Sequence, residues 1–292
     1  MSKPIIAVTG ANGQLGKEIS ALSASYPAFD FLFLSKENLP VHEAEPVRRY
    51  FEQHKPAYCI NCAAYTAVDK AETEKELAML VNGEAPGVLA EACRQYNTRF
   101  IHISTDYVFD GTATIPYRET DATHPVNFYG STKLKGEEEC RAKNPLSVIV
   151  RTSWVYSEFG NNFVKTMIRL MKEKESLNVV NDQLGSPTYA KDLAQTLLTI
   201  IANSEAGTVN WTPGIYHYSN EGVISWHAFA QAIKEITGSR CVINGIPTSG
   251  YPTPAKRPAY SVFNKEKIKT VYHIVPPSWR ESLVACIARL QQ

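Results

Sequence analysis

Residues 5–16 read Ile5-Ile6-Ala7-Val8-Thr9-Gly10-Ala11-Asn12-Gly13-Gln14-Leu15-Gly16. The β-branched run predicts a short buried strand, and the GxxGxxG spacing that follows predicts a tight turn into a helix. A glycine in the turn can adopt a positive φ, a missing Cβ lets the backbone approach a pyrophosphate, and the last glycine lets the helix pack closely on the strand. The free N–H groups at the start of the helix favour phosphates. This stretch therefore predicts a dinucleotide-binding unit.

Outward from this unit, the first half of the chain alternates strands and helices. Alternation of this kind predicts βαβ units and a parallel sheet covered on both faces. We therefore predict an α/β protein with a Rossmann-type doubly wound parallel sheet. The predicted strands are 5–9, 31–34, 58–62, 100–104 and 147–151, and the predicted helices are 14–23, 45–54, 76–96 and 131–142.

The regular alternation of strands and helices ends after about residue 155, which predicts a smaller C-terminal α/β lobe. We predict an NAD(P)-binding domain over residues 1–155 and a mainly substrate-binding lobe over residues 156–292, with elements near 188–218 returning to the first domain. The predicted helices of this half are 161–174, 190–203, 225–237 and 278–290, and the predicted strands are 177–180 and 214–218.

The residues after the second strand bear on the choice of cofactor. Dinucleotide folds usually place an acidic residue there for the ribose 2′-hydroxyl, whereas this chain has Ser35-Lys36-Glu37. Ser35 and Lys36 can meet a 2′-phosphate by hydrogen bond and charge, so NADP(H) is favoured. Glu37 lies near enough to leave NAD(H) open.

A candidate catalytic group follows in Tyr129-Gly130-Ser131-Thr132-Lys133. On a helix the i, i+4 spacing places Tyr129 and Lys133 on one face, where a lysine cation is expected to lower the pKa of the phenol. Thr105 stands at the carboxyl end of the fourth strand, where open α/β sheets bind their ligands. A hydroxyl, a tyrosine and a lysine suit carbonyl–alcohol redox chemistry with a nicotinamide.

Composition excludes several other classes of protein. The 292 residues carry 30 Lys+Arg and 29 Asp+Glu, so there is no basic excess of the kind that nucleic-acid binding uses. No apolar run is long enough for a membrane helix or a signal peptide, and we expect a cytoplasmic protein. The six cysteines suggest neither a disulfide framework nor a metal site, because Cys59 and Cys62 should point to opposite faces of one strand.

Over nearly its whole length the chain resembles the dTDP-4-dehydrorhamnose reductase family, a sugar-nucleotide branch of the extended short-chain dehydrogenase/reductase superfamily. The segments that carry the resemblance are Val8 to Gly16, Asn61 to Glu72, His102 to Gly111, Tyr129 to Lys133, Arg151 to Tyr156, Gly160 to Phe163, Asp182 to Thr188 and Pro252 to Pro258. The chain departs from the family at Ser35 and at Pro40-Val41-His42-Glu43, where aspartates are common.

The resemblance implies hydride transfer from NAD(P)H to C4 of dTDP-4-dehydro-6-deoxy-L-mannose, giving dTDP-L-rhamnose. It implies that Tyr129 protonates the alkoxide, Lys133 holds the nicotinamide ribose and Thr105 orients the keto oxygen. The candidate cofactor residues are Gly10, Asn12, Gly13, Gln14, Leu15, Gly16, Ser35, Lys36, Ala63, Ala64, Tyr65, Tyr129 and Lys133. The candidate substrate residues are Thr105, Asp106, Tyr107, Trp154, Lys256 and Arg257, the last two for the phosphates. No metal is expected, and a homodimer is left open.

Two alternatives remain from the sequence. One is another sugar-nucleotide reductase or an epimerase, or a 4,6-dehydratase, but a dehydratase typically has Asp-Glu after the strand-end threonine, where this chain has Asp106-Tyr107. The other is a non-catalytic subunit, since the regulatory subunit of methionine adenosyltransferase resembles the same family. The set of Thr105, Tyr129 and Lys133 favours catalysis.

Overall fold

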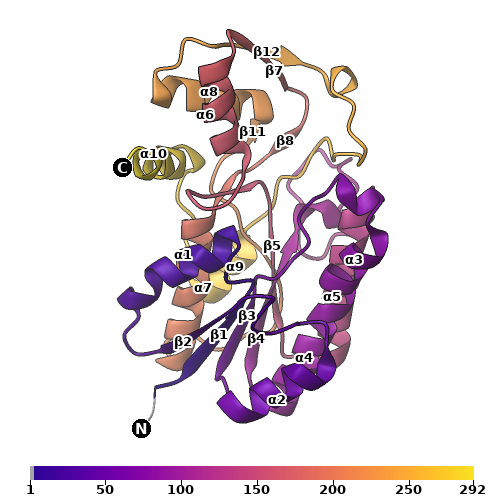
Figure 1. The fold of residues 1–292 in the computed structure, drawn as a ribbon, viewed down its shortest axis with the longest axis vertical. Helices are drawn as coiled ribbons and strands as arrows, with labels where there is room; N and C mark the ends of the chain where they lie inside the picture. Colours follow the sequence, from indigo (N-terminus) through magenta and orange to yellow (C-terminus); the bar gives the residue numbers. More distant parts are fainter. Residues whose placement is uncertain (1–2) are drawn as a thin grey trace.

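A sheet of six parallel strands forms the centre of the larger lobe in the computed structural model, which describes residues 3–292 (Figure 1). In spatial order the strands are β10 (Gly214–His217), β5 (Val148–Thr152), β4 (Arg99–Thr105), β3 (Tyr58–Asn61), β1 (Ile5–Thr9) and β2 (Asp30–Leu34). The chain builds outward in opposite directions from β1 and β3, so their carboxyl ends form the switch point where such sheets bind ligands. The predicted Rossmann-type fold is confirmed. Residues 1 and 2 of the predicted first domain lie outside the described residues.

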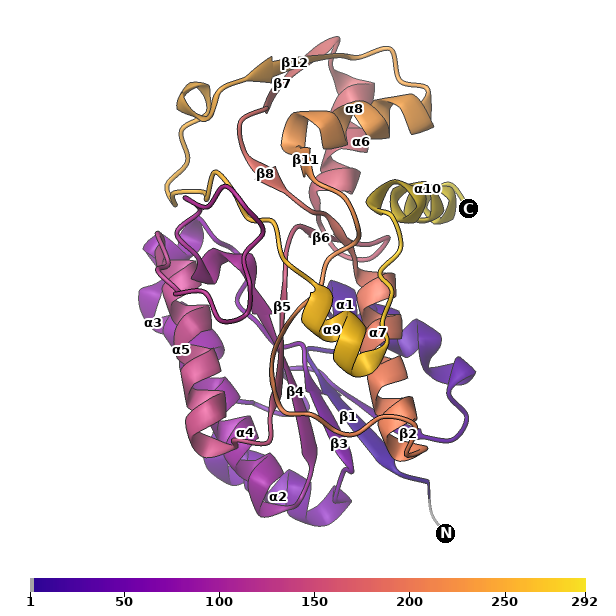
Figure 2. The ribbon, with the colours of Figure 1, turned by 180° about the vertical axis from the view of Figure 1, so that it is seen from behind.

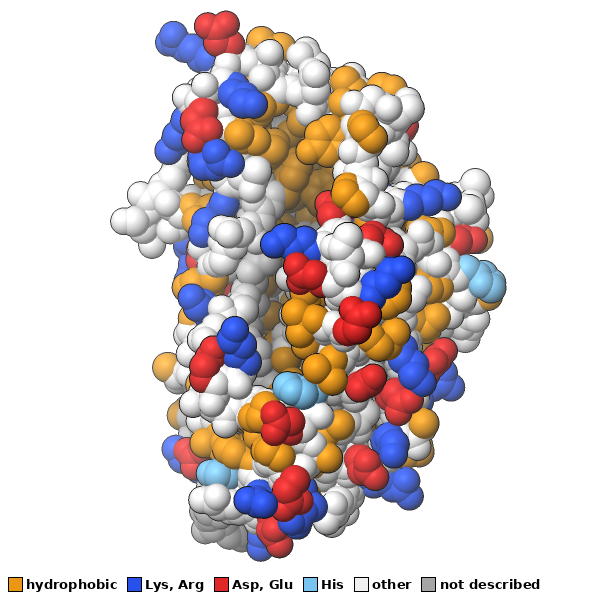
Figure 3. Space-filling model, turned by 45° about the vertical axis from the view of Figure 1, so that its right-hand side comes forward, with side chains coloured by type: hydrophobic (Ala, Val, Ile, Leu, Met, Phe, Trp, Pro, Cys, Tyr) orange, Lys and Arg blue, Asp and Glu red, His pale blue; other side chains and the backbone are white. Residues whose placement is uncertain are grey.

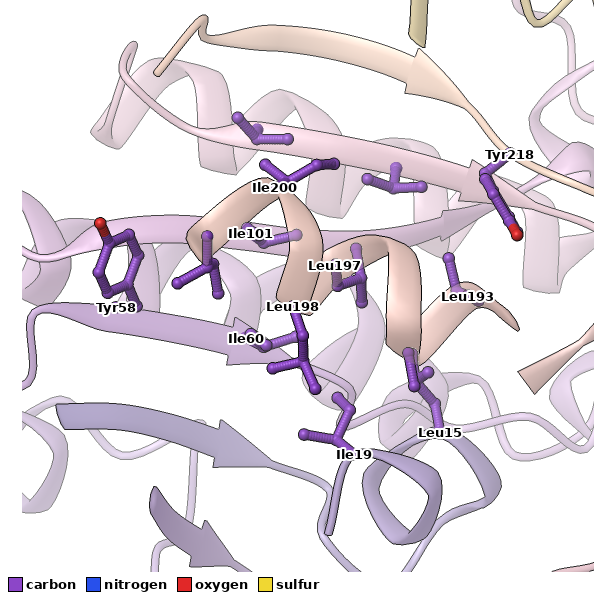
Figure 4. Packing of buried hydrophobic residues seen from close by; sticks show 14 of the residues in the cluster. Leu15, Ile19, Tyr58, Ile60, Ile101, Leu193, Leu197, Leu198, Ile200 and Tyr218 are labelled. Atoms are coloured by element: carbon purple, nitrogen blue, oxygen red, sulfur yellow. The ribbon is translucent and has the colours of Figure 1, made fainter. Parts of the chain in front are cut away.

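Helices cover both faces of this sheet (Figure 2). On one face lie α1 (Gln14–Leu22), α7 (Ala190–Glu205) and α9 (Glu266–Tyr272), and on the other lie α2 (Ala44–His54), α4 (Ala85–Gln95) and α5 (Phe128–Lys143). Leu15 and Ile19 of α1 meet Leu193 and Leu197 of α7 over the strands (Figure 4). The glycine loop therefore connects the buried strand β1 to α1, and α7 packs against α1.

The prediction of a single helix over residues 76–96 is wrong in the middle of that range. The structure has α3 (Lys75–Met79), a π-helical turn, η3 (Leu80–Glu84), and then α4. Asn82 in this turn binds the backbone of Tyr65, donating to its carbonyl at 2.9 Å and accepting from its N–H at 2.8 Å. A Cβ on Gly136 would lie 2.2 Å from the Asn82 carbonyl oxygen, so α5 passes close to the turn. The turn thus links the loop after β3 to α5.

The smaller lobe has its own apolar core beyond the carboxyl ends of the strands (Figure 1). Its strands β7 (Ser176–Val180) and β12 (Val242–Ile246) pair in parallel. Its helices are α6 (Phe163–Glu173), α8 (Trp226–Thr237) and α10 (Trp279–Leu290), and its two short sheets pair β8 (Leu184–Gly185) with β11 (Ile224–Ser225) and β6 (Val155–Tyr156) with β9 (Thr188–Tyr189).

The chain crosses between the lobes more than once. After β9 it returns to the larger lobe as α7 and β10, and α9 adds Ile268 and Tyr272 to the core on the α1 face. Neither α9 nor β12 was predicted from the sequence. In the part of the chain that is described, no helix combines the length and apolar character that crossing a membrane requires.

Candidate active site

A cavity of about 580 Å³ lies at the carboxyl ends of the strands. It brings together the glycine loop, the loop after β3, the end of β4 and the face of α5 that carries Tyr129 and Lys133. The candidate residues that line it are Gly13, Gln14, Leu15, Ala64, Thr105, Asp106, Tyr107, Tyr129, Lys133 and Trp154. In the space-filling view, one face of the molecule is hollowed in its upper half, with hydrophobic side chains in the hollow (Figure 3).

Gly10 is required at its position by both its backbone conformation and its surroundings. Its φ is +66°, and a Cβ there would lie 2.5 Å from the Ala63 nitrogen and 2.6 Å from the Cys62 oxygen. Gly13 precedes α1, and no described side chain caps this end of the helix. The first N–H groups of α1 are therefore left to meet an anion, as the GxxGxxG spacing predicts.

Tyr129 lies in the first turn of α5, which begins at Phe128. Asn127 caps this helix by accepting a hydrogen bond from the Gly130 N–H at 2.8 Å. Burial raises the pKa of Tyr129 to about 12, and a hydrogen bond with Thr105 opposes that rise. The ring of Tyr107 packs edge-on against Tyr129, with their centroids 5.5 Å apart.

The expectation that Lys133 lowers the pKa of Tyr129 is wrong for this structure. Lys133 is 2% exposed, and its ammonium donates to the Ile103 carbonyl at 2.6 Å. Burial lowers the pKa of Lys133 to about 8, and the groups that shift the pKa of Tyr129 are Thr105 and Asp106, with burial as the largest cause. Desolvation of the phenol dominates, so Tyr129 is protonated at neutral pH and is suited to act as an acid.

Thr105 and Asp106 lie where β4 ends. The Thr105 hydroxyl donates to Asp106 Oδ1 at 3.0 Å and accepts from the Tyr107 N–H at 3.3 Å. Asp106 is 1% exposed, and its Oδ2 has no hydrogen-bond partner among the described residues. A buried carboxylate oxygen without a donor is costly unless a ligand supplies one.

Burial raises the pKa of Asp106 to about 6, and this shift predicts a pH-dependent stability. Because the pKa of Asp106 is higher in the folded state, the protonated carboxyl stabilises the fold fully only below the unfolded-state pKa of about 4. This stabilisation is lost as the pH rises through the folded-state pKa of about 6. The advantage of Asp106→Asn over the wild type in free energy of unfolding should therefore grow by about 2 kcal/mol between pH 4.5 and pH 8, measured by urea denaturation. Asp110→Asn is the control, because the Thr112 backbone N–H lowers the pKa of Asp110 and its variant should lose stability at pH 8. A constant Asp106→Asn difference over this range would contradict the prediction.

Trp154 stands between the two lobes in a constrained conformation. Its φ is +50°, and its ring stacks on Trp226 with centroids 3.5 Å apart. A Cβ on Gly185 would lie 2.6 Å from the Trp154 ring, so the ring fills the space that this glycine leaves. Trp226 was not among the substrate residues predicted from the sequence, where its only signal is its place at the start of an amphipathic helix.

A second cavity, of about 620 Å³, shares Tyr107 with the first and extends into the smaller lobe. Arg257 lines it and pairs with Asp69, with 2.8 Å between Nη2 and Oδ2. Lys256 is exposed and lines a different hollow beside Asp110. The structure thus brings one of the two predicted cations to this cavity. Asp69 was missed, although it lies in one of the segments that carry the family resemblance.

Of the remaining candidate cofactor residues, some line a cavity and others do not. Ser35 and Asn12 line a third cavity beside the glycine loop, whereas the side chain of Lys36 is 91% exposed and lies 3.9 Å from Glu37. Ala63 and Tyr65 anchor the loop after β3, because their N–H groups donate to Asn61 Oδ1 and Asn82 Oδ1. Among the described residues, no three His, Cys, Asp or Glu side chains are grouped so that they could hold a metal ion.

Known proteins of one family match nearly the whole length of the chain. The family model described as the RmlD substrate binding domain matches residues 4–292. The chain is 42% identical to a dTDP-4-dehydrorhamnose reductase from Burkholderia thailandensis, over 98% of each protein. Its fold matches a dTDP-4-dehydrorhamnose reductase crystal structure from Clostridium acetobutylicum with a TM-score of 0.93, at 40% identity over 99% of this chain and all of that one. A Bacillus anthracis reductase solved in complex with NADP matches with a TM-score of 0.93, at 36% identity over 99% of this chain and all of that one.

Proposed function

The chain belongs to the dTDP-4-dehydrorhamnose reductase family, and from this membership we propose how its own residues carry out the reaction. The protein reduces the C4 keto group of dTDP-4-dehydro-6-deoxy-L-mannose to give dTDP-L-rhamnose, a step of sugar-nucleotide biosynthesis, and its cofactor is NADP(H). The observation that carries the assignment of roles is the single cavity that holds the glycine loop, Thr105, Tyr129 and Lys133.

The larger lobe fits a dinucleotide. The uncapped start of α1 suits the pyrophosphate, and Gly10 lets the backbone of Cys62 and Ala63 lie directly against the glycine loop. When bound, the nicotinamide supplies the hydride. Lys133 is proposed to hold the nicotinamide ribose, since its ammonium reaches the cavity from α5 while the Ile103 carbonyl fixes its position.

Tyr129 is proposed as the proton donor to the keto oxygen. A phenol is protonated at neutral pH even at its ordinary pKa near 10, and burial raises the pKa of Tyr129 further, so the residue carries the proton that a reduction requires. The Thr105 hydroxyl hydrogen-bonds within the same group and is proposed to orient the keto oxygen. The Asn127 cap and the end of β4 position these two groups.

The sugar nucleotide is proposed to lie across both lobes. Asp106 Oδ2 is a buried acceptor suited to a sugar hydroxyl, and Trp154 offers a ring on which the sugar can pack. Arg257 suits the pyrophosphate by charge, and the second cavity beside it is lined by Phe163, Met167 and other apolar groups. On this proposal the smaller lobe recognises the substrate.

The test supplies dTDP-4-dehydro-6-deoxy-L-mannose and follows the absorbance of NADPH and of NADH separately. We expect oxidation of the reduced cofactor that depends on the sugar nucleotide, and faster with NADPH. Well-folded protein that turns over neither cofactor would contradict the proposal. NAD(H) that stays bound through purification would instead favour an epimerase.

A further inference from the structure

A cavity of about 470 Å³ lies between α1 and the end of β2, beside the glycine loop. Its lining residues are Ala11, Asn12, Lys17, Ser20, Ala21, Phe33, Ser35, Asn38 and Phe159. In dinucleotide folds, the space beyond the second strand receives the adenosine ribose, and the residues there distinguish a 2′-hydroxyl from a 2′-phosphate. The polar groups of this cavity therefore decide the choice between NAD and NADP.

The cation expected from the sequence does not belong to this cavity. The Lys36 side chain is 91% exposed, lies near the Glu37 carboxylate and is not among the lining residues. Glu37 does not line the cavity, but its carboxylate lies beside Ser35, because a hydrogen bond from the Ser35 side chain lowers the pKa of Glu37.

Lys17, in the first turn of α1, is the one charged residue that lines the cavity among those described. Within residues 3–292 it forms no ion pair. Its ammonium lies 5.9 Å from the centroid of the Phe159 ring. Phe159 belongs to the segment that follows β6, whose Asn162 donates to Gln14 Oε1 at 2.9 Å, so this segment closes the cavity against α1.

The opposite wall of the cavity supplies neutral donors. The Ser35 hydroxyl and the Ser35 N–H both donate to Asn38 Oδ1, at 2.9 and 3.2 Å. This orientation leaves the Asn38 amide nitrogen to donate. The Ser35 hydroxyl has one hydrogen and can donate it to a phosphate only in place of Asn38 Oδ1. A cation on one wall and an amide donor on the other are complementary to a dianionic phosphate.

We propose that Lys17, together with Ser35 and Asn38, binds the 2′-phosphate of the adenosine ribose, and that Lys17 sets the preference for NADP(H) over NAD(H). This inference rests on the proposed function, because it assumes that the cavity beside the glycine loop receives the adenosine half of the cofactor. It replaces Lys36 with Lys17 as the cation that selects the cofactor.

The test measures binding of two fragments by titration calorimetry, with no reaction involved. The fragments are 2′,5′-ADP, which carries the 2′-phosphate, and 5′-AMP, which lacks it. Lys17→Met should weaken 2′,5′-ADP binding about tenfold or more and leave 5′-AMP binding unchanged, because a charge-assisted contact to the 2′-phosphate is lost. Lys17→Arg should retain most of the affinity, and Lys36→Met, the matched control, should bind both fragments like the wild type.

Three results would overturn the proposal. Lys17→Met could bind 2′,5′-ADP as tightly as the wild type, it could lose affinity for both fragments equally, or Lys36→Met could show the selective loss instead. Failure of the proposed function is distinct, because it would appear as absence of sugar-nucleotide turnover by the wild type with either reduced cofactor. Loss of selectivity at Lys17 would leave that turnover in place with NADH.

Discussion

Tyr129→Phe should lower kcat about 10³-fold and leave the affinity for NADPH unchanged. The substitution removes only the hydroxyl, so the ring still packs against Tyr107 while the proton donor is lost. General acid catalysis by a positioned side chain contributes about 10²–10⁴-fold to rate. Steady-state kinetics with the sugar nucleotide gives kcat, and fluorescence titration with NADPH gives the affinity.

Tyr260→Phe is the control for this experiment. It removes a phenol hydroxyl from a ring that packs against Tyr117. Tyr260 is not among the residues that line the cavity with Tyr129. We expect its kcat to equal that of the wild type. If Tyr129→Phe retained full rate while folded, the proton would have to come from another group, and the assignment of Tyr129 would be wrong.

Glu137→Ala should lower the free energy of unfolding by about 3–5 kcal/mol, the cost of leaving a buried charge unpaired. Glu137 and Arg151 are each 2% exposed, and they form two hydrogen bonds, at 2.7 and 2.9 Å. The Ser104 hydroxyl donates to the same carboxylate. Without Glu137, the Arg151 guanidinium would face a neutral His217, whose pKa burial lowers, and the ring of Phe109.

Glu139→Ala is the matched control on the same helix. Glu139 pairs with Lys135 at i, i+4, with part of both side chains exposed, and such pairs contribute about 0.3–0.5 kcal/mol. Urea denaturation of the two variants gives the comparison. Equal losses would show that the buried pair does not anchor α5 to β4 and β5, and the position of Tyr129 relative to Thr105 would then need another explanation.

Much of the fold could be predicted because its signals are local. The β-branched run before Gly10 and the helix that begins at Gln14 define the first strand–loop–helix unit, and repetition of the pattern defines the parallel sheet. The i, i+4 spacing of Tyr129 and Lys133 places both on one face of α5 whatever the rest of the chain does. Apart from β7, the short strands of the smaller lobe carry no such signal, because partners distant in sequence define them, as β7 defines β12.

The sequence by itself determined the parallel sheet, the glycine loop and the spacing of the proposed catalytic pair, Tyr129 and Lys133, since each depends on patterns within a few residues. The tertiary structure decided the chemical state of those residues and which cations meet a ligand. Burial, and not the charge of Lys133, controls the pKa of Tyr129. Lys17 lines the cavity beside the glycine loop whereas Lys36 does not, and folding joins Arg257 to Asp69. Desolvation and long-range pairing depend on atoms far apart in the chain, so they arise only when the chain has folded.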